Sequence, residues 1–152
     1  MGSGRIDDNA GVRFVAFLAL GIVANIWYPI HLFPSALARA LGGAILVGGV
    51  ALGPIWGIRT LHVAGTTVRP DKSTTKLVSS GPFRFSRNPL YLSLTLIYAG
   101  IALIANSIWA LVLLIPINFI MSRFVIRREE EYLARTFGGE YERYKMNVRR
   151  WI

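Results

Sequence analysis

Four long stretches of this 152-residue chain carry almost no charge, and they constrain its fold more than any other feature. They cover residues 14–33, 35–58, 89–105 and 108–126. About 20 helical residues cross the ~30 Å hydrocarbon layer of a membrane. The sequence is 53% hydrophobic and 16% charged, whereas a typical soluble domain is about 25% charged. We therefore expect an all-α, polytopic membrane protein with about four transmembrane helices.

The polar segments between these stretches suggest the organisation of a single integral membrane domain, 1–152. Two spans occupy 1–58, and a cofactor-binding loop, a helical hairpin and C-terminal interfacial helices occupy 59–152. The hairpin should be tight, because only Asn106 and Ser107 separate the third stretch from the fourth. The third stretch is short for a full span, which favours tilt or local thinning of the bilayer.

Glycines are concentrated in the second stretch. Gly49, Gly53 and Gly57 follow one another at four-residue spacing and so share one helix face. Such a face suits close packing of two helices, which is the simpler interpretation. The alternative is a smooth wall beside a ligand.

The positive charges predict the orientation in the membrane. With four spans, every lysine and arginine except Arg39 falls on the same side. The positive-inside rule makes that side cytoplasmic, so both termini should be cytoplasmic in the cell membrane. The net charge of +9 is thereby explained without nucleic acid, because the charges lie between apolar stretches rather than along a groove.

Other classes of site are excluded by composition. The chain has no cysteine and only two histidines, His31 and His62. Disulfides, thiolate zinc sites and a cysteine nucleophile are therefore absent, and no metal site is expected. A transporter is also not expected, because the spans contain almost no ionisable residues.

Two polar segments should meet at the cytoplasmic ends of the hairpin, bringing Asn88 close to Glu129. Asn88-Pro89 is typical of a helix start, with asparagine as the N-cap and proline in the first turn. The residues before it, 81–87, alternate aromatic and basic side chains. That run fits stacking on an adenine ring and burial among lipid headgroups equally well.

Three consecutive glutamates follow the fourth stretch. Glu131 lies four residues after Arg127, which predicts a surface ion pair. Glu129 and Glu130 point about 100° apart on a helix, so at least one faces the bundle. A carboxylate there would accept hydrogen bonds from ribose hydroxyls or complement a cationic ligand.

Together these motifs resemble the isoprenylcysteine carboxyl methyltransferase family. This group of integral membrane methyltransferases includes phospholipid methyltransferase relatives, and the chain looks like a prokaryotic-type member. The resemblance rests on the order and spacing of these motifs: Thr75-Lys76-Leu77-Val78, Gly81-Pro82-Phe83, Arg87-Asn88-Pro89-Leu90-Tyr91, Glu129-Glu130, and Phe137-Gly138 followed by Tyr141 and Tyr144.

The resemblance implies S-adenosylmethionine as the methyl donor, bound at the cytoplasmic surface. The cofactor-binding candidates are Thr75, Lys76, Leu77, Val78, Phe83, Arg87, Asn88, Pro89, Leu90, Tyr91, Glu129, Glu130 and Tyr141. The catalytic candidates are Glu129, Glu130, Arg127 and Arg123. Two residues depart from the family pattern. Asn88 replaces a histidine, and Val125 stands where eukaryotic members have a substrate arginine, for which Arg123 or Arg127 would substitute.

The expected function is S-adenosylmethionine-dependent methylation of a small lipophilic or lipid acceptor at a carboxyl, amine or thiol group. Phospholipid N-methylation specifically is one alternative. A non-catalytic membrane scaffold or tolerance protein with the same fold is the other. The sequence identifies neither the acceptor nor the oligomeric state.

Overall fold

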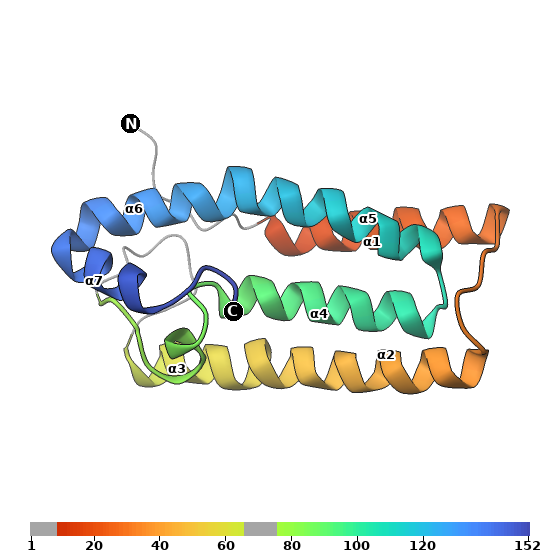
Figure 1. Ribbon diagram of the computed structural model, residues 1–152, viewed down its shortest axis with the longest axis horizontal. Helices are drawn as coiled ribbons and strands as arrows, with labels where there is room; N and C mark the ends of the chain where they lie inside the picture. Colours follow the sequence, from red (N-terminus) through yellow and green to blue (C-terminus); the bar gives the residue numbers. More distant parts are fainter. Residues whose placement is uncertain (1–8, 66–75) are drawn as a thin grey trace.

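The computed structural model describes residues 9–65 and 76–152, and within these ranges it is all-helical. Four rods lie along one axis and alternate in direction, so the first begins and the last ends at the same end (Figure 1). They are α1 (Ala10–Trp27); α2 (Ser35–Val50) continued by η1 (Ala51–Gly57) and α3 (Ile58–Val63); α4 (Pro89–Ile104); and α5 (Ile108–Ile120) continued by η3 (Met121–Ile126) and α6 (Arg127–Phe137). A 3₁₀ turn, η2 (Gly81–Arg84), precedes α4, and α7 (Gly139–Asn147) follows α6.

Three of the rods are long and apolar enough to cross a membrane, with 18, 29 and 30 residues, and α4 is a shorter apolar helix. Large apolar side chains on these rods face outward, among them Val15, Leu20, Val47, Ile115 and Phe119. Water disfavours such a surface, whereas lipid accepts it. The expected helical membrane class is therefore confirmed, while the compartment at each end stays a prediction from the charges.

The first rod lies nearer the N-terminus than expected. It covers Ala10–Trp27 rather than the whole apolar stretch 14–33, and it ends just before Pro29, the proline at which a kink or a helix end is expected. Tyr28 precedes Pro29, and a residue before proline is disfavoured in the α conformation. The helix therefore ends before the proline, and the chain crosses to α2 through an irregular connection.

The second and fourth rods are longer than the apolar stretches that predicted them. They continue as helix to Val63 and Phe137, although spans were expected to end at residues 58 and 126. A 30-residue helix is about 45 Å long, against ~30 Å of hydrocarbon. Because the charged residues of this rod begin at Arg123, its membrane-spanning part ends near that residue and α6 extends beyond it.

The glycine face of the second rod packs against α4, which confirms the simpler interpretation. A Cβ atom at Gly42 would lie 2.6 Å from the carbonyl oxygen of Gly100, and one at Gly53 would overlap Ser93. The Ser93 hydroxyl donates a 2.7 Å hydrogen bond to the Gly49 carbonyl. The two backbones approach this closely only because side chains are absent.

The predicted hairpin between α4 and α5 is also present. Asn106 adopts a left-handed φ of 48°, a conformation that asparagine tolerates better than most residues. Its side-chain amide bonds the backbone of Leu32 and Phe33 and so secures the connection between α1 and α2. Ser107 caps α5 by accepting a hydrogen bond from Ala110 N–H.

Candidate functional site

The helices α6 and α7 lie at one end of the bundle (Figure 1). Most residues of these two helices are polar or charged, and we call this end the polar end. Four segments meet there: the loop from η2 to Asn88, the start of α4, the helices α6 and α7, and the C-terminal tail after Asn147. The loop can turn sharply at Gly81, which has a φ of 59°. A Cβ added at this position would lie 2.5 Å from the Thr60 hydroxyl oxygen, so there is no space for a side chain. Residues 84–88 thereby reach α6 and the tail.

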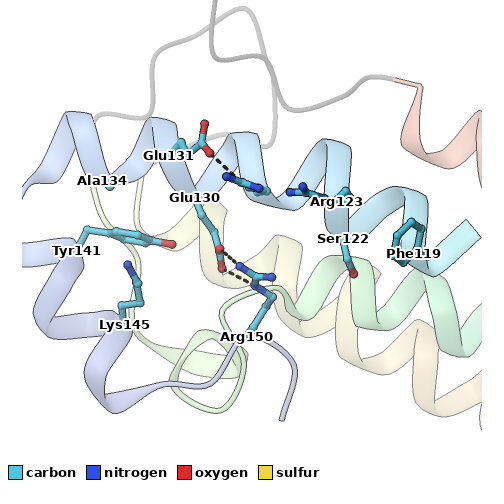
Figure 2. A pocket seen from close by; sticks show the side chains of 10 residues that line it. Phe119, Ser122, Arg123, Glu130, Glu131, Ala134, Tyr141, Lys145 and Arg150 are labelled. Carbon is cyan, nitrogen blue, oxygen red and sulfur yellow. Dashed lines mark hydrogen bonds and ion pairs between the residues drawn. The ribbon is translucent and has the colours of Figure 1, made fainter.

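Glu130 is held by two guanidinium groups. Arg87 Nη1 lies 3.0 Å from Glu130 Oε1, and Arg150 Nε donates to the same oxygen at 3.1 Å. Arg150 also contacts the second oxygen, as Figure 2 shows. The hydrogen bond to Glu130 raises the pKa of Arg150. The side chains of Glu130 and Arg87 are only 13% and 11% exposed, so this pair is a fixed, nearly dry contact.

Glu129, one residue earlier, lies in a different environment. Its Oε2 atom is buried and makes no hydrogen bond to the described part of the chain. Burial raises the pKa of this carboxyl group to about 7, the Tyr91 hydroxyl lowers it, and the charge of Glu130 raises it further. Glu129 belongs to α6, outside the membrane-spanning part of its rod. It is therefore a carboxyl group that can change its protonation state near neutral pH.

Two tyrosines of α7 line the same region. The Tyr141 side chain is 1% exposed; burial and the charge of Glu130 raise its pKa, while Arg87 lowers it. The Tyr144 hydroxyl donates a 2.6 Å hydrogen bond to the Phe83 carbonyl. Burial raises the pKa of Tyr144 as well, so both phenols stay neutral donors. α7 is thereby tied to the loop before α4.

Asn88 holds the C-terminal tail instead of capping α4. It occupies the N-cap position with Pro89 in the first turn, as predicted, but its side chain makes no capping hydrogen bond. Its amide donates to the Arg150 carbonyl at 3.1 Å, and the Ser86 hydroxyl donates to the same oxygen. The Arg87 N–H donates to the Arg149 carbonyl at 2.9 Å. The tail therefore covers the loop through backbone carbonyls that residues 86–88 bind.

A groove of about 480 Å³ opens on the outer side of Glu130. It follows η3 and α6 on one wall and α7 with the tail on the other (Figure 2). Its lining combines apolar, basic and acidic residues: Phe119, Ser122, Arg123, Arg127, Glu130, Glu131, Ala134, Tyr141, Lys145 and Arg150. Glu130 and Tyr141 thus border the groove on one side and the buried Arg87 on the other.

The structure brings together some of the residues predicted from sequence and separates others. Five of them form the buried cluster: Arg87, Tyr91, Glu129, Glu130 and Tyr141. Arg123 and Arg127 line the groove, and Arg127 pairs with Glu131 at 3.1 Å as expected.

The remaining candidates lie at the margin of this cluster. Leu90 faces the second rod, where it would contact a Cβ at Gly57. Lys76 is exposed, Leu77 and Val78 are partly buried, and Pro89 is buried at the start of α4. Phe83 contributes its carbonyl to Tyr144. Thr75 lies outside the described residues.

Sequence reasoning missed Arg150 and Ser86. Arg150 lies 20 positions after its partner Glu130, and no local spacing rule links residues so far apart. Ser86 stands within the aromatic and basic run, where a single small hydroxyl side chain carries no sequence signal for a tertiary contact. Only the folded tail shows that both residues hold the site together.

The buried cluster fits the polar part of an amino-acid-bearing nucleoside such as S-adenosylmethionine. Arg87 Nε and Glu129 Oε2 are buried and unbonded within the described residues. They offer one cationic donor and one acceptor, as a ligand with a carboxylate, an ammonium group and ribose hydroxyls requires. Buried polar atoms without partners are costly, so a ligand that satisfies both would be favoured. Among the described residues, no cluster of side chains could hold a metal ion.

These features define a polytopic helical membrane protein with a polar, charged site at one end of its bundle. The family model for phospholipid methyltransferases matches residues 37–140, more than half of the chain, and the chain belongs to this family. An uncharacterised protein of Haemophilus influenzae is 47% identical over 64 residues, which cover 41% of this chain and the whole of that protein. No solved structure matches the chain.

Family membership confirms part of the resemblance inferred from sequence. The sequence motifs predict a wider group of membrane methyltransferases that includes the phospholipid methyltransferases, and the family match supports that part of the prediction. The closer likeness to isoprenylcysteine carboxyl methyltransferases stays a prediction.

Proposed function

We propose that this protein transfers a methyl group from S-adenosylmethionine to a lipophilic or lipid acceptor at the membrane surface. The observation that carries this proposal is the buried Glu129 carboxyl group, whose Oε2 atom is unbonded, one residue before the Glu130 that pairs with Arg87, in a member of the phospholipid methyltransferase family. A structural role alone leaves the buried carboxyl group of Glu129 with an unexplained desolvation cost.

Each residue of the buried cluster has a distinct task in this proposal. Arg87 binds the carboxylate of the methyl donor, and Glu129 accepts hydrogen bonds from its ammonium group or ribose hydroxyls. Glu130 keeps Arg87 oriented through their 3.0 Å ion pair. Tyr141 and Tyr144 close the site from α7, and the tail covers the loop. Together they would hold the donor in one orientation and exclude water.

When bound, the donor would supply an electrophilic methyl group on a sulfonium; an in-line attack by the acceptor on the methyl carbon would break the C–S bond and release S-adenosylhomocysteine. Positioning accounts for much of the acceleration of such a reaction. A carboxylate acceptor needs no general base, whereas an amine must lose a proton. Glu129 suits that role because burial raises its pKa to about 7, close to physiological pH. The groove beside Glu130 would admit the acceptor.

Calorimetric titration of the purified protein in detergent with S-adenosylmethionine and S-adenosylhomocysteine tests the proposal. We expect binding by the wild type and a loss of about 100-fold in Glu129→Ala, because charge-assisted hydrogen bonds are lost. Glu140→Ala is the matched control, since Glu140 is an exposed carboxylate on α7. Unchanged affinity in Glu129→Ala would contradict the assignment of this pocket.

Two alternatives predict different results. Phospholipid N-methylation, which the family name favours, predicts that radiolabelled methyl groups appear on an amine headgroup. A non-catalytic scaffold or tolerance protein predicts that folded wild-type protein binds neither adenosyl compound.

A further inference from the structure

A second pocket lies at the polar end, between the second rod and the turn η2, and its volume is about 470 Å³. Trp56, Arg59 and Thr60 line it from the rod, and Ser80 and Gly81 line it from the loop. None of these residues lines the groove beside Glu130 or belongs to the buried cluster. Figure 1 shows α3 and α6 at opposite edges of the bundle, so the pocket is separate from the site of the proposed reaction.

The side of the polar end that holds this pocket is basic. All glutamates that the structure describes belong to α6 and α7, and the described residues before α6 include no acidic one. Arg59 is exposed and has no ion-pair partner within residues 9–65 and 76–152. The Arg84 guanidinium lies 5.4 Å from the centre of the Phe85 ring, a contact that does not neutralise its charge. An anionic ligand is therefore attracted to this side of the protein.

The pocket lies where the second rod leaves the membrane. Arg59 is the first charged residue of that rod after Arg39, and Trp56 precedes it by about 4.5 Å along the helix axis. The Trp56 side chain is 45% exposed, and its ring centre lies 6.2 Å from that of Phe85. Tryptophan prefers the interface between membrane and water. An aromatic surface on the membrane side thus adjoins a basic one, as a ligand with an acyl chain and an anionic headgroup requires.

The pocket also joins two parts of the chain that otherwise touch at few points. Gly81 packs directly against Thr60, and Phe85 contacts Trp56. The loop that begins at Ser80 continues to Arg87, which pairs with Glu130. A ligand held by Arg59 on the rod and Ser80 on the loop would therefore restrict the segment that carries Arg87.

We propose that this pocket binds the phosphate group of an anionic membrane lipid, which is not itself methylated and which steadies the loop before α4. The Arg59 guanidinium and the Ser80 hydroxyl donate to the phosphate oxygens, and Trp56 lies beside the start of an acyl chain. This inference goes beyond the proposed function and does not depend on it, because no residue of the pocket touches the buried cluster in the proposed reaction.

Native mass spectrometry of the full chain in a neutral detergent tests the lipid site. The probes are dioctanoyl phosphatidylglycerol, which is anionic, and dioctanoyl phosphatidylcholine, which is zwitterionic. We expect the wild type to prefer phosphatidylglycerol, and Arg59→Gln to weaken that binding about tenfold through loss of one charge-assisted contact. Arg59→Lys should retain part of the preference because the charge remains.

Arg135→Gln is the matched control, because Arg135 is an exposed arginine at the same end of the bundle that lines neither this pocket nor the groove. Equal affinity of the wild type for both lipids, or equal losses in Arg59→Gln and Arg135→Gln, would overturn the proposal. Displacement of phosphatidylglycerol by an equal concentration of glycerol 3-phosphate, which has no acyl chain, would overturn the assignment to a lipid.

Hydrogen exchange tests the effect of the lipid on the loop. The Phe83 and Phe85 N–H groups donate to the carbonyls of Ser80 and Pro82, within the turn η2. With phosphatidylglycerol at ten times its Kd, exchange of these two amides should slow about tenfold in the wild type, because opening of the loop then requires loss of the lipid. Arg59→Gln should show a much smaller change at the same lipid concentration. Exchange that phosphatidylglycerol leaves unchanged in the wild type would refute the ordering of the loop.

Discussion

The interface between the second rod and α4 differs from the polar end in what holds it together. At the interface, Gly42, Gly49 and Gly53 let two backbones approach, and one serine hydroxyl bonds a carbonyl. At the polar end, two arginines surround one glutamate, and tyrosine and asparagine side chains bind backbone carbonyls. Shape specifies the first region, and charge and hydrogen bonding specify the second.

We therefore expect substitutions in the two regions to affect different properties: the stability of the bundle at the interface, and ligand affinity at the polar end. A backbone interface has nowhere to move when a methyl group is added, so substitutions there should affect the whole bundle. The polar end contains buried groups without partners, which is typical of sites that await a ligand. Substitutions in the second region should therefore change ligand affinity and the attachment of the tail before they unfold the protein.

The largest effect is expected at the interface, for Gly42→Ala. The new Cβ would lie 2.6 Å from the Gly100 carbonyl oxygen and 2.7 Å from the Ile104 nitrogen, both backbone atoms. We expect a loss of about 3 kcal/mol in the free energy of unfolding, as for severe overpacking. Gly43→Ala is the control, because no atom lies within 4 Å of its added Cβ. Denaturation in mixed micelles measures both, and equal stabilities would refute the close approach.

An intermediate effect is expected at the polar end, for Glu130→Gln. Arg87 would keep its charge in a nearly dry site, which we expect to cost about 2 kcal/mol, below the range for fully buried pairs because Arg150 is partly exposed. Hydrogen exchange at the Arg87 N–H, bonded to the Arg149 carbonyl, should rise as the tail loosens. Glu131→Gln, which removes only the exposed pair with Arg127, should cost no more than about 0.5 kcal/mol. Similar losses in both variants would contradict the distinction.

The smallest effect concerns pH. Because burial raises the pKa of Glu129 to about 7, this carboxyl group is mostly protonated at pH 6 and mostly ionised at pH 8. If the ionised form binds the donor, the affinity for S-adenosylhomocysteine should rise about tenfold over that interval. Calorimetry at pH 6, 7 and 8 measures it, and Glu129→Gln should remove the dependence. A falling affinity in the wild type would mean that the protonated acid binds, and a flat one that the ionisation of Glu129 does not affect binding.

Much of the bundle could be predicted because its signals are local. Uninterrupted apolar stretches define the rods, and Asn106-Ser107 leaves room only for a tight turn. The ends of the rods were harder to predict. Helix continues past Ile58 and Ile126 because charged residues end a membrane span without ending a helix.

The candidate site was predictable only in outline. The hairpin brings Arg87 and Tyr91 close to Glu129 and Glu130, since the two helices meet at one turn. Helical spacing shows that the two glutamates face different ways, but it does not tell which is paired and which is left unbonded. That depends on Arg150, which lies 20 positions after Glu130 in the chain and reaches it only because the C-terminal tail folds back. Long-range contacts of this kind have no signature in a single sequence.

The modest length of α4 has a consequence for the depth of the proposed reaction. Its 16 residues rise about 24 Å, which is about 6 Å less than the hydrocarbon thickness. Arg87 and Tyr91, at its start, are therefore set below the level that the neighbouring rods reach. A bilayer of ordinary thickness would have to thin locally or admit water at that place, which would bring headgroups closer to these side chains. In the proposed function, the length of this one helix would set the depth of the reaction in the membrane, and turnover would depend on bilayer thickness.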